Sequence, residues 1–126
     1  MIHLDTNTLI RFFIERESPK ALKVKNLIET EKEIFIADVV FPEIEYVLAK
    51  PYAIPRIKIL EIFKFIASRP NIKINSHIQQ AISIFQKTNV DMADCIITAL
   101  SFEGKLASFD EKLTKIEGVK NYWPTA

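Results

Sequence analysis

The opening stretch constrains this chain more than any other feature, because a short apolar run ends in a carboxylate and a helical pattern follows at once. The run is Ile2-His3-Leu4, the carboxylate is Asp5, and Leu9, Ile10 and Phe13 then recur at helical spacing. This pattern predicts a buried strand and a tight strand-to-helix turn. Ligands of open α/β sheets bind at the carboxyl ends of strands, so Asp5 is the first candidate functional residue.

The same alternation of β-prone runs and helical patterns continues to the end of the chain. Further strands are expected at residues 34–37, 72–74, 105–109 and 119–123. Helices are expected at residues 6–14, 19–31, 39–48, 76–87, 92–103 and 111–116, with another opening at Pro55. Gly104, just past a helix end, is expected to be left-handed. Strands that alternate with helices predict a three-layer α/β/α fold with a central, mainly parallel sheet of four or five strands.

Length and composition bound the class of protein. The 126 residues suit a single domain, 1–126, and no apolar run is long enough to span a bilayer, so no membrane partner is expected. A single cysteine argues against a disulfide framework and fits a reducing compartment, and we expect a cytoplasmic protein. The net charge of +1 argues against binding nucleic acid by bulk charge alone.

Acidic residues stand at several places where the predicted elements begin. Asp5 and Asp110 follow predicted strands, whereas Glu43, Asp91 and Asp94 belong to predicted helices. Each has a purely structural interpretation: Asp5 and Asp110 precede helices and could be N-caps, and Asp91 with Asp94 forms a D-x-x-D capping pattern. At this point the capping and functional interpretations both remain open.

The helix expected at residues 39–48 contains two glutamates. On a helical wheel Glu43 lies between Val39 and Val47, on an arc where an unpaired carboxylate would be costly to bury unless a cation lay there. Glu45 points to roughly the opposite side. The helix is apolar almost all round, so its periodicity favours Glu43 without deciding between the two.

Several carboxylates at one edge of a sheet, with no histidine among them, predict a hard divalent cation with oxygen ligands. Mg²⁺ or Mn²⁺ fits such a site better than Zn²⁺. A cation would also explain how like charges could gather there without raising one another's pKa values. Such a centre can activate water and hold a phosphodiester in line for attack.

Four segments together resemble a PIN domain, and in particular the small VapC-like toxin ribonucleases. They are LDTNTLI around Asp5, ADVVFPEIEYVL around Glu43, VDMADCIITAL around Asp94, and LASFDEKL around Asp110. The resemblance covers essentially the whole chain. It implies a Mg²⁺- or Mn²⁺-dependent endoribonuclease that cleaves single-stranded or structured RNA and leaves a 5′-phosphate. It also implies a homodimer, a small antitoxin partner and the choice of Glu43 over Glu45.

The resemblance also assigns roles to individual residues. Asp5 and Asp94 are expected to bind the metal directly, with Glu43 positioning the metal or the attacking water. Asp110 is expected to act directly or through water. The remaining candidates are polar residues beside these acids that could orient them: Thr6, Asn7, Asp91 and Ser108.

Two other function classes compete with the nuclease. One is an aspartate-based phosphotransfer domain, suggested by the strand–Asp turn. Phosphatases of the haloacid-dehalogenase type need an acid two residues after the nucleophile, where this chain has Asn7, and receiver domains need an acidic pair that is not evident here. The other is a PIN-like protein-interaction module without catalysis. Four inward carboxylates count against it, since a structural role does not require them.

The densest basic region lies just after the first predicted turn and comprises Arg11, Arg16, Lys20, Lys23 and Lys25. Its simpler interpretation is a solvated helix face. Its functional interpretation is a rim that contacts phosphates and makes binding sensitive to salt.

Overall fold

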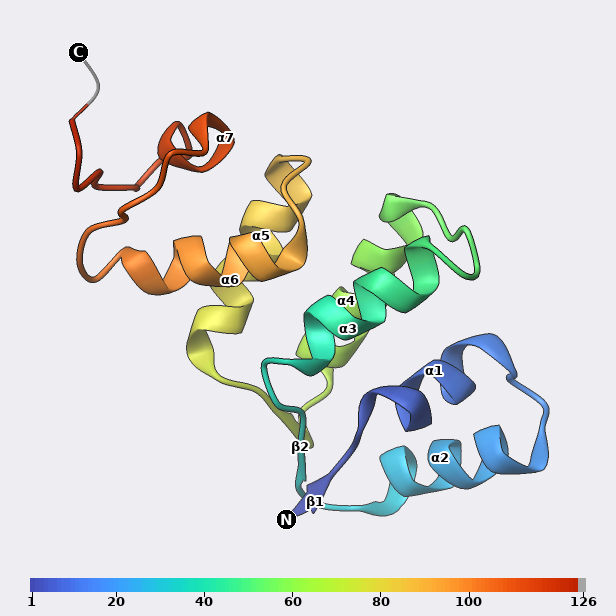
Figure 1. Cartoon of the computed structure of the whole chain (residues 1–126). Coiled ribbons are helices and arrows are strands. Elements are labelled where there is room, and N and C mark those ends of the chain that lie inside the picture. The colour runs from blue at the N-terminus through green and yellow to red at the C-terminus, as the bar shows by residue number, and fades with distance from the viewer. Residues whose placement is uncertain (125–126) are drawn as a thin grey trace. The chain divides into compact units, whose positions relative to one another are not determined.

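The computed structural model describes residues 1–124, which contain three short strands and seven helices (Figure 1). They form a first compact unit, Met1–Asn75, and a second that begins at Ser76. The elements of the first unit are β1 (Ile2–His3), α1 (Thr6–Ile14), α2 (Pro19–Thr30), β2 (Ile34–Phe35), α3 (Val40–Ala49), α4 (Arg56–Ser68) and β3 (Ile72–Lys73). Those of the second are α5 (Ser76–Lys87), α6 (Met92–Ser101) and α7 (Glu111–Thr114).

The first unit is built on a parallel sheet whose strands follow chain order, β1-β2-β3. Ile34 of β2 lies opposite Ile2 on one side and Ile72 on the other. Crossovers between parallel strands are right-handed, so this order directs both helical connections to one face of the sheet. Helix α1 accordingly packs against α2 and α3, and α3 packs against α4. The predicted α/β class with a parallel sheet is confirmed.

The core of the first unit takes side chains from the sheet and from all four of its helices. Ile34 and Ile36 are fully buried beside β2, and Phe41 of α3 is fully buried against Phe63 of α4, with ring centroids 5.5 Å apart. Burying such a side chain stabilises the fold by roughly 1.5–3 kcal/mol. The contact with α4 helps to fix α3, and α3 in turn packs against α1, which places Glu43 next to α1.

The second unit is organised around the pair α5 and α6, which pack along each other. The buried residues of this pair include Ile78 and Phe85 of α5 and Cys95 and Ala99 of α6. The free thiol of Cys95 is buried, where it packs as a small apolar residue. No helix within residues 1–124 is both long enough and apolar enough to cross a membrane.

Several details of the sequence prediction are wrong. The first strand was expected to be buried, but Ile2 and His3 of β1 are both exposed. The strands expected at 105–109 and 119–123 reduce to a single parallel bridge between Leu106 and Asn121, so the described residues hold three strands rather than four or five. Gly104 is not left-handed, because α6 ends in right-handed turns that need no such residue. In those turns the Gly104 N–H donates to the Ser101 carbonyl. The glycine with positive φ is Gly118, at 96°.

Candidate functional site

Asp5 stands at the point where β1 gives way to α1. Its backbone is extended, with φ −89° and ψ 170°, and its Oδ1 accepts a hydrogen bond of 2.9 Å from the Thr8 N–H. It is therefore the N-cap of α1, as the structural interpretation predicted. Hydrogen bonding with the Thr8 side chain and with its backbone N–H lowers the pKa of Asp5. Asp5 is consequently an exposed, ionised carboxylate at the carboxyl end of a strand.

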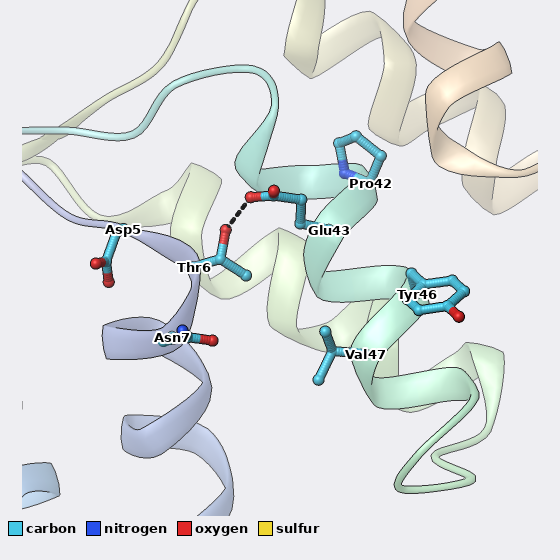
Figure 2. A pocket seen from close by; sticks show the side chains of 7 residues that line it. All are labelled: Asp5, Thr6, Asn7, Pro42, Glu43, Tyr46 and Val47. Carbon is cyan, nitrogen blue, oxygen red and sulfur yellow. Dashed lines mark hydrogen bonds between the residues drawn. The ribbon is translucent and has the colours of Figure 1, made fainter.

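Glu43 lies in the first turn of α3 and reaches toward α1. Its Oε1 accepts a hydrogen bond from the Thr6 hydroxyl, as Figure 2 shows. The expected burial of Glu43 is wrong, because the residue is exposed. Glu45 is the less exposed of the two glutamates, and its Oε2 pairs with Arg56 of α4 at 3.7 Å. Glu45 thus joins α3 to α4, whereas Glu43 joins α3 to α1.

A hollow of about 530 Å³ opens between α1 and α3 on the first unit (Figure 2). Helix α1 and the residue before it contribute polar groups, and α3 contributes one carboxylate on an otherwise largely apolar wall. The lining residues are Asp5, Thr6, Asn7, Pro42, Glu43, Tyr46 and Val47. Four predicted site residues therefore lie together here, within one unit.

Three further acids come together in the second unit. Asp91 is the N-cap of α6, and its Oδ1 accepts a hydrogen bond of 2.9 Å from the N–H of Asp94. Asp110 is the N-cap of α7, with its Oδ1 accepting at 2.9 Å from the Lys112 N–H. The Asp110 N–H in turn donates to the Ser108 hydroxyl at 3.0 Å, which fixes the turn that carries Asp110.

The pKa of Asp94 is affected by the other two acids. Partial burial raises the pKa of Asp94, and the negative charges of Asp91 and Asp110 raise it further, against an opposing effect of Lys112. Like charges shift a pKa upward in this way only when they lie near one another. Asp91, Asp94 and Asp110 therefore form an anionic cluster in the second unit.

Each half of the predicted acidic quartet is thus assembled within one unit: Asp5 with Glu43, and Asp94 with Asp110. Residues 1–124 contain no group of three or more His, Cys, Asp or Glu side chains arranged to hold a metal ion. Sequence reasoning missed Tyr46, which lines the hollow one helical turn after Glu43, and that spacing was the available signal. It also missed Lys112, two residues after Asp110.

Comparison with protein families finds that the model described as "PIN domain" matches residues 2–119. The match spans both units and includes all eight predicted site residues. Among curated proteins, no sequence matches the chain.

Proposed function

Because the chain belongs to the PIN-domain family, we propose that it is a divalent-metal-dependent endoribonuclease that hydrolyses phosphodiester bonds in RNA, with single strands as its main substrate. PIN domains are typically nucleases, generally use divalent metals and act on RNA. The observation that carries the proposal is the hollow between α1 and α3, where Asp5 and Glu43 line one wall each. A carboxylate at the end of a parallel strand, with a second carboxylate on the facing helix, is suited to a cation rather than to packing.

The chemistry of the donors fits Mg²⁺ or Mn²⁺. The residues that line the hollow include two carboxylates, the hydroxyls of Thr6 and Tyr46 and one amide, and no histidine or cysteine. Such hard oxygen donors favour magnesium and manganese over softer metals. Asp5 uses Oδ1 for its cap, and its second oxygen can serve as a ligand. In the second unit, the pKa of Asp94 is raised first by partial burial and then by the charges of Asp91 and Asp110, and a bound cation would offset both effects.

In this proposal each acid has a distinct role. Asp5 and Asp94 would bind the metal directly, Glu43 would position the metal or the attacking water, and Asp110 would act directly or through water. A bound metal would supply charge for the reacting phosphate and lower the pKa of the attacking water. The Thr6 hydroxyl holds Glu43, the Ser108 hydroxyl holds the Asp110 turn, and Asp91 holds the start of α6. Asn7 lines the hollow beside Asp5.

The decisive experiment measures cleavage of a single-stranded RNA with Mg²⁺ or Mn²⁺, with and without a chelator. Glu43→Gln should fold normally and lose at least about 100-fold in rate, since general-base and positioning groups contribute on that order. Glu45→Gln on the same helix is the matched control. It should retain cleavage, because Glu45 pairs with Arg56 and does not line the hollow.

Several outcomes would overturn the proposal. The nuclease role fails if the wild type does not cleave RNA with either metal, or if the two glutamine variants cleave equally well. A labile acyl-phosphate on Asp5 would instead identify a phosphotransfer domain. A folded protein that binds no divalent ion would identify a non-catalytic interaction module.

We further propose that this nuclease is the toxin of a toxin–antitoxin pair, acting in the cytoplasm as a homodimer with a small antitoxin protein. The support is the resemblance of its four acidic segments to the VapC-like toxins. Expression of the wild type should arrest bacterial growth, and Asp5→Asn should not. The product of a neighbouring small reading frame should restore growth, and light scattering should give twice the chain mass. Equal growth with wild type and Asp5→Asn would contradict the toxin role.

A further inference from the structure

A second depression on the first unit begins where the candidate site ends. It has a volume of about 350 Å³ and lies between α1 and α2, which pack side by side (Figure 1). We call it the α1–α2 groove, and its lining residues are Asp5, Asn7, Thr8, Arg11, Lys20, Lys23, Val24 and Leu27. Asp5 and Asn7 line both this groove and the hollow of the candidate site. The two depressions therefore meet at Asp5.

The α1–α2 groove is positively charged apart from the end that it shares with the site. Arg11, Lys20 and Lys23 line it, and Asp5 is the acid among its lining residues. Lys20 and Lys23 are exposed and take part in no ion pair among residues 1–124. With a net charge of only +1 for the whole chain, this concentration of cations is local. Local basic grooves attract polyanions whatever the total charge.

Arg11 differs from the two lysines because it has a partner. Its guanidinium pairs with Glu15 at 2.9 Å, and the two side chains are 42% and 40% exposed. Exposed pairs four residues apart on a helix are weak, so a phosphate can displace Glu15 as the partner of Arg11. Lys25, on the same helix as Lys20 and Lys23, pairs with Glu29 at 3.9 Å and does not line the groove.

We propose that the α1–α2 groove binds the phosphodiester backbone of the RNA substrate, with Arg11, Lys20 and Lys23 contacting phosphates on one side of the bond to be cut. This inference rests on the proposed ribonuclease function and adds the path by which the strand reaches Asp5. Basic grooves that track a flexible backbone are typical of proteins that bind single strands. Val24 and Leu27 form an uncharged part of the lining that does not repel phosphate.

The test separates binding from cleavage by using the full chain with Asp5→Asn, in which the bond is not cut. The binding constant of a fluorescent, unstructured RNA oligonucleotide is measured by anisotropy over a series of KCl concentrations. The slope of log K against log salt is negative, and each lost phosphate contact should make it shallower by roughly 0.7 for a single strand. Adding Lys20→Gln and Lys23→Gln together should therefore reduce the slope by about 1.4. Adding Lys25→Gln, the matched control, should leave the slope unchanged.

The inference fails if the double variant keeps the slope of the Asp5→Asn protein, or if Lys25→Gln changes the slope as much. In the cleaving protein, the double variant should raise KM and leave kcat unchanged, since the groove contacts substrate and transition state alike. If the double variant cleaves RNA normally in the presence of metal and its KM is unaltered, RNA binding by the groove is refuted and the proposed nuclease function is not. If RNA binding depends on the groove lysines but the wild type cleaves no RNA, the proposed nuclease function is refuted and RNA binding by the groove is not.

Discussion

The hydrogen bond from Thr6 to Glu43 offers the sharpest test of how the first half of the site is held. It joins the first residue of α1 to the first turn of α3, and it aims the Glu43 carboxylate along one wall of the hollow (Figure 2). Thr6→Val removes the hydroxyl and keeps the shape and branching of the side chain. Its effects should therefore come from this hydrogen bond alone.

The expected size of the effect follows from the exposure of the partners. Hydrogen bonds to charged groups contribute roughly 1.5–3 kcal/mol, but Glu43 is exposed and Thr6 is half-buried, so about 1 kcal/mol is expected. The Glu43 carboxylate remains solvated in the variant, so no further penalty arises. With a urea dependence of roughly 1–3 kcal/mol per molar, the unfolding midpoint should fall by about 0.3–1 M.

The assay is a double-mutant cycle with Thr6→Val and Glu43→Ala, followed by urea denaturation. The two substitutions should show a coupling energy of about 1 kcal/mol. In RNA cleavage, Thr6→Val should reduce activity about 10–100-fold at limiting metal, as loss of a group that orients a metal-site residue typically does. Higher metal concentration should restore part of that loss.

Additive stability effects in the cycle would refute this reasoning, because they would mean that the two side chains do not interact. So would a Thr6→Val variant that cleaves RNA like the wild type at every metal concentration. Either result would remove the hydrogen bond from the account of how Glu43 is positioned.

Three further predictions follow from the caps, charges and glycines. Asp5→Ala should lose about 1 kcal/mol of stability in urea denaturation at pH 7 while Asp5→Asn keeps the cap. The pKa of Asp5 is lowered on folding. The ionised carboxylate therefore stabilises the fold at pH values above the unfolded-state pKa of about 3.9, and this stability is lost as the pH falls through the folded-state pKa. The pKa of Asp94 is raised in the folded protein, so stability is lost as the pH rises through that folded-state pKa. Asp94→Asn should therefore have a higher melting temperature than the wild type at pH 7, and the difference should disappear near pH 3. Gly118→Ala should destabilise by about 1–2 kcal/mol in thermal melting, because φ is +96° and an added Cβ would lie 3.2 Å from the Phe102 ring. Gly104→Ala, with nothing within 4 Å of the added Cβ, should be neutral.

Features that depend on neighbours a few residues away could be predicted from the sequence. The bounds of α1 and α5 coincide with the predicted ranges. Asp5, Asp91 and Asp110 are N-caps, as their positions before helical patterns indicated. In each case the capping carboxylate accepts a hydrogen bond from a backbone N–H two or three residues along the chain, so the interaction is complete within one short segment.

Pairing between distant segments was decided by the tertiary structure. Residues 105–109 have the composition of a strand, but a ladder needs a partner in register, and within residues 1–124 only Leu106 and Asn121 form a bridge there. This is why the predicted number of strands was too high. A β-prone run carries no information about how much of it another segment will match.

The two glutamates of α3 show most clearly the difference between what the sequence determines and what the tertiary structure determines. The helix is apolar almost all round, so its own periodicity could not distinguish Glu43 from Glu45. Their neighbours on other helices do: Thr6 of α1 donates to Glu43, and Arg56 of α4 pairs with Glu45. These partners lie 37 and 11 positions away along the chain. A carboxylate's role depends on which charge or donor packing brings to it, and that is a property of the folded unit rather than of the helix.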